Sequence, residues 1–163
     1  ILPGQGAFKS AIENLKKSGV YNKIIEHNND EKPILAICLG MQLLFYNSDE
    51  FMNCEGLKLL SGEVKKLNVK NMPSPIIGWY KIFNLNKTNN NPVFNKDSLN
   101  KYYYFAHSMY CLLGEENAHI TNVKYNGINV ISTVNCNNIY GTQFHPELSN
   151  QSGLTIINNF LNL

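Results

Sequence analysis

The stretch that decides the fold is Ile34-Leu35-Ala36-Ile37-Cys38-Leu39-Gly40. Its first four residues are all apolar, which is typical of a central strand of a parallel sheet that is buried on both faces. A helical pattern follows over Leu39 to Tyr46, so Cys38 is expected at a sharp strand-to-helix junction. Small residues, Ala36 and Gly40, stand two positions before and after Cys38, as so tight a turn requires. This arrangement is typical of a nucleophile elbow.

Elements of both kinds flank this junction. Helical patterns with one apolar face cover three further segments, residues 7–17, 20–26 and 153–161. Strand patterns are expected within residues 56–67 and over residues 76–85, 102–106, 121–125, 128–134 and 139–144. Asn126-Gly127 is a strong signal for a two-residue hairpin turn. This order predicts an α/β protein, an open sheet flanked by helices, with a mostly parallel core and an antiparallel extension.

The 163 residues suit one domain, which we expect to span residues 1–163. Within it, residues 86–100 are rich in Asn and Lys and predict a solvated surface loop. The chain opens on Ile1-Leu2-Pro3-Gly4, which is typical of the end of a buried strand followed by a turn. We therefore expect further strands of the same sheet to come before Ile1.

Composition excludes several classes of function. The net charge is +2 and no cluster of basic residues is present, so nothing argues for binding to nucleic acid. No apolar run approaches the roughly 20 residues that a membrane-spanning helix needs. The four cysteines lack the spacing of a zinc site, and we expect them to be reduced thiols of a cytoplasmic protein.

Cys38 has a candidate partner in the segment Gln143-Phe144-His145-Pro146-Glu147. His145 at the end of a strand could take the thiol proton and later give it to a leaving group. Glu147 would share a face with His145 in extended backbone and could orient its ring. At a helix N-terminus, Cys38 is expected to favour the thiolate. A buried core cysteine and a structural histidine are the alternatives for each residue alone.

A glycine-rich turn, Leu2-Pro3-Gly4-Gln5-Gly6, follows the first apolar residues. Such a turn can aim backbone N–H groups at an oxyanion, and the N–H of Leu39 would be the natural second donor. The alternative is a loop that only needs glycine for a positive φ.

Together these segments resemble the class I glutamine amidotransferases. The resemblance covers essentially the whole chain, and within the family it is strongest to the glutaminase subunit of imidazole glycerol phosphate synthase, known as HisH. The matching segments are Leu2–Phe8, Ile37–Phe45, Gly78-Trp79, Tyr104–Ser108 and Gly141–Glu147.

The resemblance implies a role for each matching position. The family's nucleophile, general base and orienting carboxylate match Cys38, His145 and Glu147. Its glutamine-binding positions match Gly6, Gln42, His107 and Ser108. The backbone that completes its oxyanion hole matches Gly4 and Gln5, beside the N–H of Leu39. No metal or organic cofactor is implied, and the implied partner is a HisF-like (β/α)₈-barrel synthase that receives the ammonia.

Several positions depart from the family pattern. Gln5 stands where the family usually has Val, and Leu148 stands where it usually has Lys. Around Gly78-Trp79 the usual Pro-His-x-Gly-Trp-Asn reads Pro-Ile-Ile-Gly-Trp-Tyr over residues 75–80. These changes concern the partner more than the chemistry.

Three alternatives stay open at this stage. A HisH-like glutaminase could supply ammonia for an acetamidino group in a surface-sugar pathway. A cysteine hydrolase or peptidase could use the same scaffold, although Gln42, one helical turn after Cys38, favours a small amide substrate. The third alternative is a non-catalytic interaction module.

Overall fold

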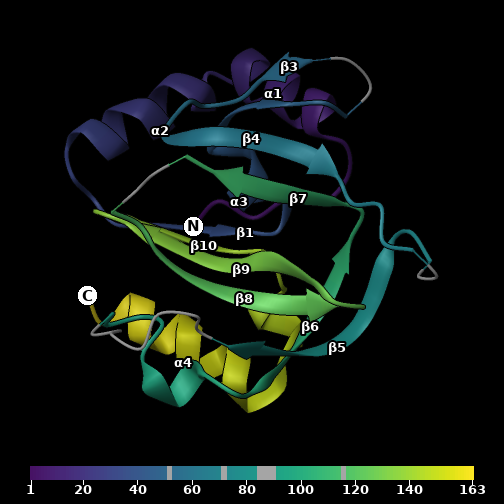
Figure 1. Ribbon diagram of the computed structural model, residues 1–163. Coiled ribbons are helices and arrows are strands. Elements are labelled where there is room, and N and C mark those ends of the chain that lie inside the picture. The colour runs from purple at the N-terminus through teal and green to yellow at the C-terminus, as the bar shows by residue number, and fades with distance from the viewer. Residues whose placement is uncertain (51–52, 71–72, 84–90, 115–116) are drawn as a thin grey trace.

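The computed structural model describes residues 1–50, 53–70, 73–83, 91–114 and 117–163, which form two sheets flanked by helices (Figure 1). The larger sheet has the strand order β1-β10-β9-β8-β5-β6 and the smaller one the order β3-β2-β4-β7. The larger sheet consists of β1 (Ile34–Ile37), β5 (Ile76–Phe83), β6 (Tyr102–His107), β8 (His119–Tyr125), β9 (Ile128–Cys136) and β10 (Ile139–Thr142). The smaller sheet consists of β2 (Phe45–Ser48), β3 (Cys54–Glu55), β4 (Leu60–Lys66) and β7 (Met109–Leu113).

The longer helices flank the two sheets, and the short helix that follows β1 lies between them (Figure 1). They are α1 (Phe8–Lys17), α2 (Val20–Asn29), α3 (Leu39–Leu43) and α4 (Asn150–Leu161), with 3₁₀ turns η1 (Lys96–Ser98) and η2 (Pro146–Leu148). In Figure 1, α4 lies against one side of the larger sheet, while α1 and α2 lie beyond the smaller sheet on the other side. The helices expected over residues 7–17, 20–26 and 153–161 are thus confirmed. In the described part of the chain, no helix is long and apolar enough to cross a membrane.

The core has two parts, one on each side of the larger sheet. Ile156 and Phe160 of α4 join one cluster, which contains Phe144 and the aromatic side chains of β6. The other cluster fills the space between the two sheets and includes Phe8 of α1 and Val64 of β4. Strand β1 passes between them, and all four of its residues are buried, as its apolar run predicts.

The α/β architecture is confirmed, but the parallel part of the sheet is smaller than expected. In the larger sheet β1 pairs in parallel with β10, and Leu2 adds a parallel bridge to Ala36. The other pairs of that sheet are antiparallel. Short turns impose this on the β8–β9 and β9–β10 pairs, because two-residue loops can only join antiparallel neighbours. One is the expected hairpin at Asn126 and Gly127, which have φ of 44° and 95°, and residues 137–138 form another.

The helix expected over Leu39 to Tyr46 is too long. Helix α3 ends at Leu43, and Phe45–Ser48 form strand β2, which pairs with β4 and β3. Phe45 is fully buried between the sheets, and its segment gains partners on both sides. Tertiary pairing and burial therefore override the local helical pattern.

The surface loop expected over residues 86–100 is also wrong in its described part, residues 91–100. Asn91, Val93, Phe94 and Ser98 are buried there. The carbonyl oxygen of the Asn91 side chain accepts the backbone N–H groups of Val93 and Phe94, at 2.8 and 2.7 Å. This side-chain turn directs Phe94 into the core, where its ring meets Tyr140. Residues 84–90, which include the end of the strand expected over 76–85, lie outside the described residues.

Candidate active site

Cys38 occupies a strained backbone conformation at the junction of β1 and α3. Its φ and ψ are 53° and −110°, a region that costs a non-glycine residue about 1–3 kcal/mol. Two backbone hydrogen bonds hold it there, from Cys38 N–H to Thr142 O at 2.7 Å and from Gln42 N–H to Cys38 O at 3.2 Å. A Cβ on Gly40 would lie 2.0 Å from the carbonyl oxygen of Leu2, so this position requires glycine. The predicted elbow is confirmed.

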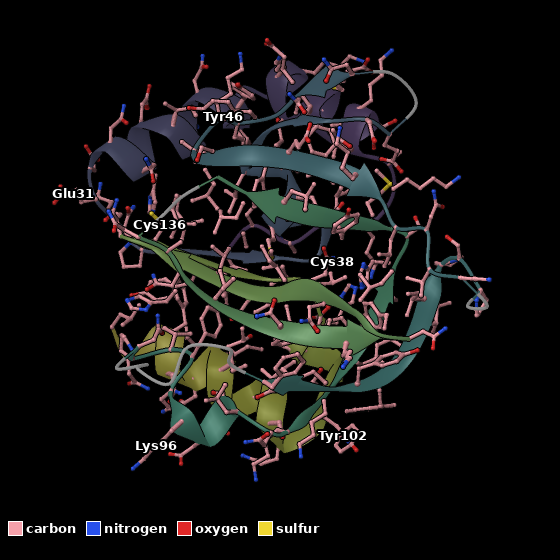
Figure 2. The ribbon with its side chains drawn as sticks, viewed as in Figure 1. Glu31, Cys38, Tyr46, Lys96, Tyr102 and Cys136 are labelled. Atoms are coloured by element: carbon pink, nitrogen blue, oxygen red, sulfur yellow. The ribbon has the colours of Figure 1, made fainter. Side chains whose placement is uncertain are left out.

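The elbow opens into a cavity of about 400 Å³. Of the ten residues predicted for the site, all except Gly4 and Glu147 line this cavity. The side-chain view places Cys38 toward the middle of the molecule, whereas Tyr46 and Tyr102 lie at its periphery (Figure 2). Tertiary folding therefore brings together segments that are more than 100 residues apart in the sequence.

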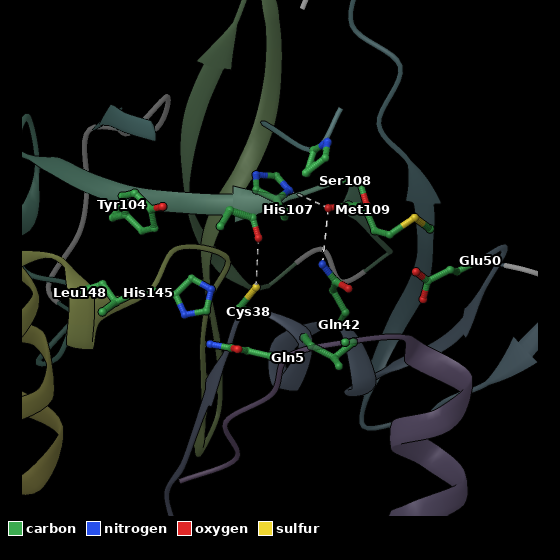
Figure 3. Close-up of a pocket in the computed structure, with 14 residues that line it drawn as sticks. Gln5, Cys38, Gln42, Glu50, Tyr104, His107, Ser108, Met109, His145 and Leu148 are labelled. Carbon is green, nitrogen blue, oxygen red and sulfur yellow. Dashed lines mark hydrogen bonds between the residues drawn. The ribbon is translucent and has the colours of Figure 1, made fainter. Parts of the chain in front are cut away.

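His145 and Glu147 form a hydrogen-bonded pair beside Cys38. Nδ1 of His145 lies 2.7 Å from Oε1 of Glu147, and the imidazole faces the sulfur of Cys38 (Figure 3). The His145 side chain is 5% exposed and the Glu147 side chain 44% exposed. The contact between His145 and Glu147 is as predicted, but the backbone conformation that produces it is not the expected one. Glu147 lies in the 3₁₀ turn η2 and not in extended backbone, because Pro146 opens a tight turn there.

The segment carrying His145 is fastened to strand β6. The N–H of His145 donates to Tyr104 O at 2.9 Å. The Ser149 hydroxyl donates to His145 O at 2.6 Å and accepts the N–H of Tyr104 at 2.9 Å. These bonds fix the position of the imidazole relative to the cavity wall.

The Cys38 sulfur is a thiol at neutral pH, so the expected preference for the thiolate is wrong. Burial raises the pKa of Cys38 from its ordinary 9.0 to about 11, and the negative charge of Glu147 adds to the rise. The backbone N–H of Leu39 and the side chain of Gln143 donate toward the sulfur and lower the pKa, but by less. Helix α3 has only five residues, so its dipole does not compensate for burial. A base must therefore take the proton when the sulfur reacts.

His107 lines the cavity, but both nitrogens of its ring are bonded to protein. Nδ1 lies 2.7 Å from Met109 O, and Nε2 lies 2.9 Å from the hydroxyl of Tyr125. Burial lowers the pKa of His107 to about 4, so the ring is neutral at pH 7. The neighbouring Ser108 also lines the cavity. The prediction that His107 binds glutamine therefore cannot rest on its ring nitrogens, because both already have partners in the protein.

Comparison with known proteins decides the family. The model of the family "Glutamine amidotransferase class-I" matches residues 1–163. The chain belongs to this family. It is 41% identical over 164 residues to the imidazole glycerol phosphate synthase subunit HisH of Sulfurimonas denitrificans, covering 98% of this chain and 77% of the relative. To the HisH subunit of Pyrococcus furiosus it is 37% identical over 163 residues, covering 100% of this chain and 80% of the relative.

Solved structures agree on the fold of this amidotransferase. A crystal structure titled as a glutamine amidotransferase matches it with a TM-score of 0.72 at 14% identity, covering 98% of this chain and 75% of the other. At that identity the match concerns the fold alone. It confirms the α/β architecture that the sequence predicts.

Sequence reasoning missed one acidic residue in the cavity wall of the amidotransferase. Glu50 lines the cavity, and its Oε2 accepts the N–H of Phe8 at 2.7 Å. Helix α1 has Ala7 at its N-cap and no side-chain cap of its own, so Glu50 supplies the cap from 42 residues away. No local sequence pattern predicts a contact between residues so far apart in the chain. In the described part of the chain, no three His, Cys, Asp or Glu side chains are grouped so as to hold a metal ion.

The glycine-rich turn packs against the elbow. A Cβ on Gly4 would lie 3.0 Å from both Gly40 N and Leu39 Cβ, so the turn approaches α3 closely. Gly6 has φ of 101° and lines the cavity together with Gln5. Glycine is therefore needed for close approach at one end of the turn and for backbone conformation at the other.

Proposed function

We propose that the protein hydrolyses glutamine with Cys38 as nucleophile and supplies the ammonia to a synthase subunit that makes imidazole glycerol phosphate. One observation carries the proposal. The thiol of Cys38 sits on a strained elbow in a cavity, faced by the imidazole of His145, whose other nitrogen is hydrogen-bonded to Glu147. Membership of the amidotransferase family and identities of 37–41% to HisH subunits support glutamine as the substrate.

The reaction would proceed in two stages. His145 takes the proton of Cys38 as the sulfur attacks the side-chain amide carbon of glutamine, and a tetrahedral oxyanion forms. The N–H of Leu39 and backbone N–H groups of the turn at Gly4 and Gln5 stabilise this oxyanion. His145 then gives its proton to the departing ammonia, which leaves a γ-glutamyl thioester. In the second stage His145 activates water, and hydrolysis of the thioester releases glutamate and restores the thiol.

The cavity walls fit the polar ends of glutamine. Glu50 presents a carboxylate suited to the α-ammonium group of the substrate. Gln42 lies on the wall between Glu50 and Cys38, and Gly6 and Ser108 complete that region in the proposal (Figure 3). His107 lines the cavity but offers no free ring nitrogen to the substrate, because its ring nitrogens are bonded to Met109 and Tyr125.

The proposed partner is a HisF-like (β/α)₈ barrel that covers the cavity mouth. Ile77, Trp79 and Leu148 are 58%, 45% and 49% exposed, and Leu148 lines the cavity. Such exposed apolar side chains beside a cavity are typical of an interface. Ammonia is mostly protonated at neutral pH and then loses its nucleophilicity, so delivery through a closed interface protects it. The relatives named as HisH subunits favour this acceptor, in the cytoplasm.

Two of the departures from the family pattern do not argue for another acceptor. Ile76 is buried, and the ring of Tyr80 packs against Phe105 and Tyr125 in T-shaped contacts. Both side chains thus belong to the core and not to the exposed interface. Leu148 and Gln5 are the exposed departures. The surface-sugar alternative therefore has no specific support here.

Labelling with a diazo-ketone analogue of norleucine tests the proposal. The chain is treated with this glutamine mimic, and its peptides are analysed by mass spectrometry. We expect an adduct on Cys38 that glutamine prevents and that Cys38→Ser abolishes. Cys54→Ser is the matched control, because Cys54 is half-buried on β3 outside the cavity wall. Labelling of Cys38 that glutamine does not reduce would contradict the proposal.

A further inference from the structure

Gln143 is a buried amide that contacts the reactive sulfur. Its side chain is 0% exposed, and its Nε2 lies 3.7 Å from Sγ of Cys38. Its Oε1 lies 3.2 Å from Nε2 of Gln42. The backbone N–H of Gln143 donates to Ser132 O at 2.8 Å, which places the residue on the sheet. The amide therefore links a cavity residue to the thiol.

The hydrogen bonds beyond Gln42 have only one possible direction. The carbonyl oxygen of Met109 can only accept, and it takes bonds from Gln42 Nε2 at 3.4 Å and from His107 Nδ1 at 2.7 Å. Because Nδ1 carries the proton of the neutral ring, Nε2 of His107 accepts from the hydroxyl of Tyr125 at 2.9 Å.

The same logic orients both amides. Gln42 donates one N–H to Met109 O and the other to Gln143 Oε1, so its Nε2 is fully used. Since Oε1 of Gln143 accepts from Gln42, the NH₂ group of Gln143 must face Cys38. A network of bonds thus links Tyr125 to the thiol through the shared acceptor Met109 O, across strands β8, β6 and β7 and helix α3.

We propose that Gln143 is a further catalytic residue, whose N–H stabilises the thiolate of Cys38 during attack, and that His107 and Tyr125 are positioning residues that hold it in place. The inference rests on Cys38 being the nucleophile. A hydrogen bond from a neutral amide to a charged acceptor is stronger than one to a neutral acceptor. Gln143 would therefore favour the thiolate over the thiol where burial opposes ionisation.

Before His145 takes the proton of Cys38, the other titratable groups around the sulfur do not supply such a donor, and afterwards the imidazolium of His145 supports the thiolate as well (Figure 3). His145 and Glu147 approach from turn η2, and the carboxylate of Glu147 disfavours the thiolate. Cys111 on β7 and Tyr125 on β8 have raised pKa values because of burial, so both are neutral near pH 7. His107 on β6 is neutral as well. Gln143 and the N–H of Leu39 remain as the donors that counter burial.

The test compares wild type with Gln143→Met and Gln143→Glu in the full chain. Met keeps the length of the side chain and removes the donor without adding a charge, so it isolates the donor. Glu keeps the acceptor for Gln42 and removes the donor, but its carboxylate also disfavours the thiolate, as that of Glu147 does. The rate of Cys38 alkylation by iodoacetamide is followed against pH by peptide mass spectrometry. Alkylation does not require glutamine turnover. It therefore tests the role of Gln143 independently of the proposed reaction, which the labelling with the glutamine mimic tests.

We expect both variants to move the alkylation profile to higher pH by about one unit, with alkylation about tenfold slower at pH 8. Loss of a hydrogen bond to a charged group should lower kcat about 10- to 100-fold, with a smaller change in KM. Tyr125→Phe removes the hydroxyl that anchors His107 and should move the profile in the same direction by less. Gln151→Met, at an exposed position of α4, should leave it unchanged.

Circular dichroism and urea unfolding establish that each variant is folded. A folded Gln143→Glu or Gln143→Met protein whose alkylation profile coincides with that of wild type would overturn the proposal. Equal losses of stability and activity with an unmoved profile would do the same, because they indicate a purely structural role. If Gln143→Met fails to fold, Gln143→Leu takes its place as the uncharged variant without a donor. An unmoved profile in folded Gln143→Glu overturns the proposal in any case, because both the lost donor and the added carboxylate should raise the pKa of Cys38.

Discussion

Oε1 of Glu147 lies 2.7 Å from Nδ1 of His145, while the same imidazole faces the sulfur of Cys38. The carboxylate can only accept, so Nδ1 carries a proton and Nε2 is the nitrogen that can take one. Among the described residues, no hydrogen bond joins Cys38 directly to His145, and the sulfur lies near Ala106 O at 4.0 Å. The proton transfer to His145 therefore belongs to the reacting complex, in which such contacts tighten.

Glu147→Gln should lower kcat for glutamine hydrolysis while KM changes little. The amide cannot hold the imidazole in the required tautomer as the carboxylate does. A buried triad carboxylate is worth about 10⁴-fold, and we expect a smaller loss of about 10²-fold, because water reaches the half-exposed Glu147. Steady-state assays of ammonia release measure this. Glu13→Gln on the exposed face of α1 is the control, and an unchanged kcat for Glu147→Gln would argue against the pair.

Gly40→Ala should destabilise the protein and disturb the elbow. The new Cβ would lie 2.0 Å from Leu2 O, so either α3 or the strand at Leu2 must shift. We expect the free energy of unfolding to fall by about 1–3 kcal/mol, as for other overpacked cores. Urea denaturation measures it. Gly114→Ala is the control, because its Cβ meets the flexible Ser61 side chain at 3.0 Å; similar losses for both would refute the argument.

Stability should depend on pH through His107 between pH 6.5 and 4. Burial lowers the pKa of His107 from 6.5 to about 4 in the folded protein. The contribution of the neutral ring is complete above pH 6.5. It is lost as pH falls through 4, because only the unfolded chain takes up the proton readily. We expect a loss of about 3 kcal/mol.

His107→Gln measures this contribution by difference. The variant should be less stable than wild type at pH 7.5, and the gap should narrow toward pH 4. His119→Gln, at an exposed position on β8, should run parallel to wild type. A constant gap between wild type and His107→Gln at all pH values would show that the ring titrates normally.

Trp79→Ala should weaken binding to the proposed barrel synthase subunit. Trp79 is 45% exposed on β5, and its ring meets Tyr104 of the cavity wall at a centroid distance of 5.9 Å. A tryptophan at the centre of an interface typically contributes about 2 kcal/mol or more. Calorimetric titration with the synthase subunit from the same organism measures it. Leu112→Ser, 41% exposed on β7, should bind normally, and equal affinity for Trp79→Ala would move the interface elsewhere.

Local sequence signals were sufficient for the elbow, for the hairpin and for the contact of His145 with Glu147. Each signal rests on a short-range requirement. Gly40 meets a steric limit, and Asn126-Gly127 supplies two positive φ angles. The same approach failed for residues 45–48, because their strand exists only through pairing with β4 and β3. It failed for Phe94 as well, since the turn at Asn91 buries a segment whose composition is that of a surface loop.

The sequence by itself determined the α/β class, the family and the candidate residues of the site. These follow from short motifs whose geometry is set within a few residues. Only the tertiary structure decided how the site is tuned. It placed Glu50 at the cap of α1, it engaged both nitrogens of His107, and it turned the amide of Gln143 toward Cys38. Burial and the directions of hydrogen bonds arise between segments far apart in the chain, so no local pattern encodes them.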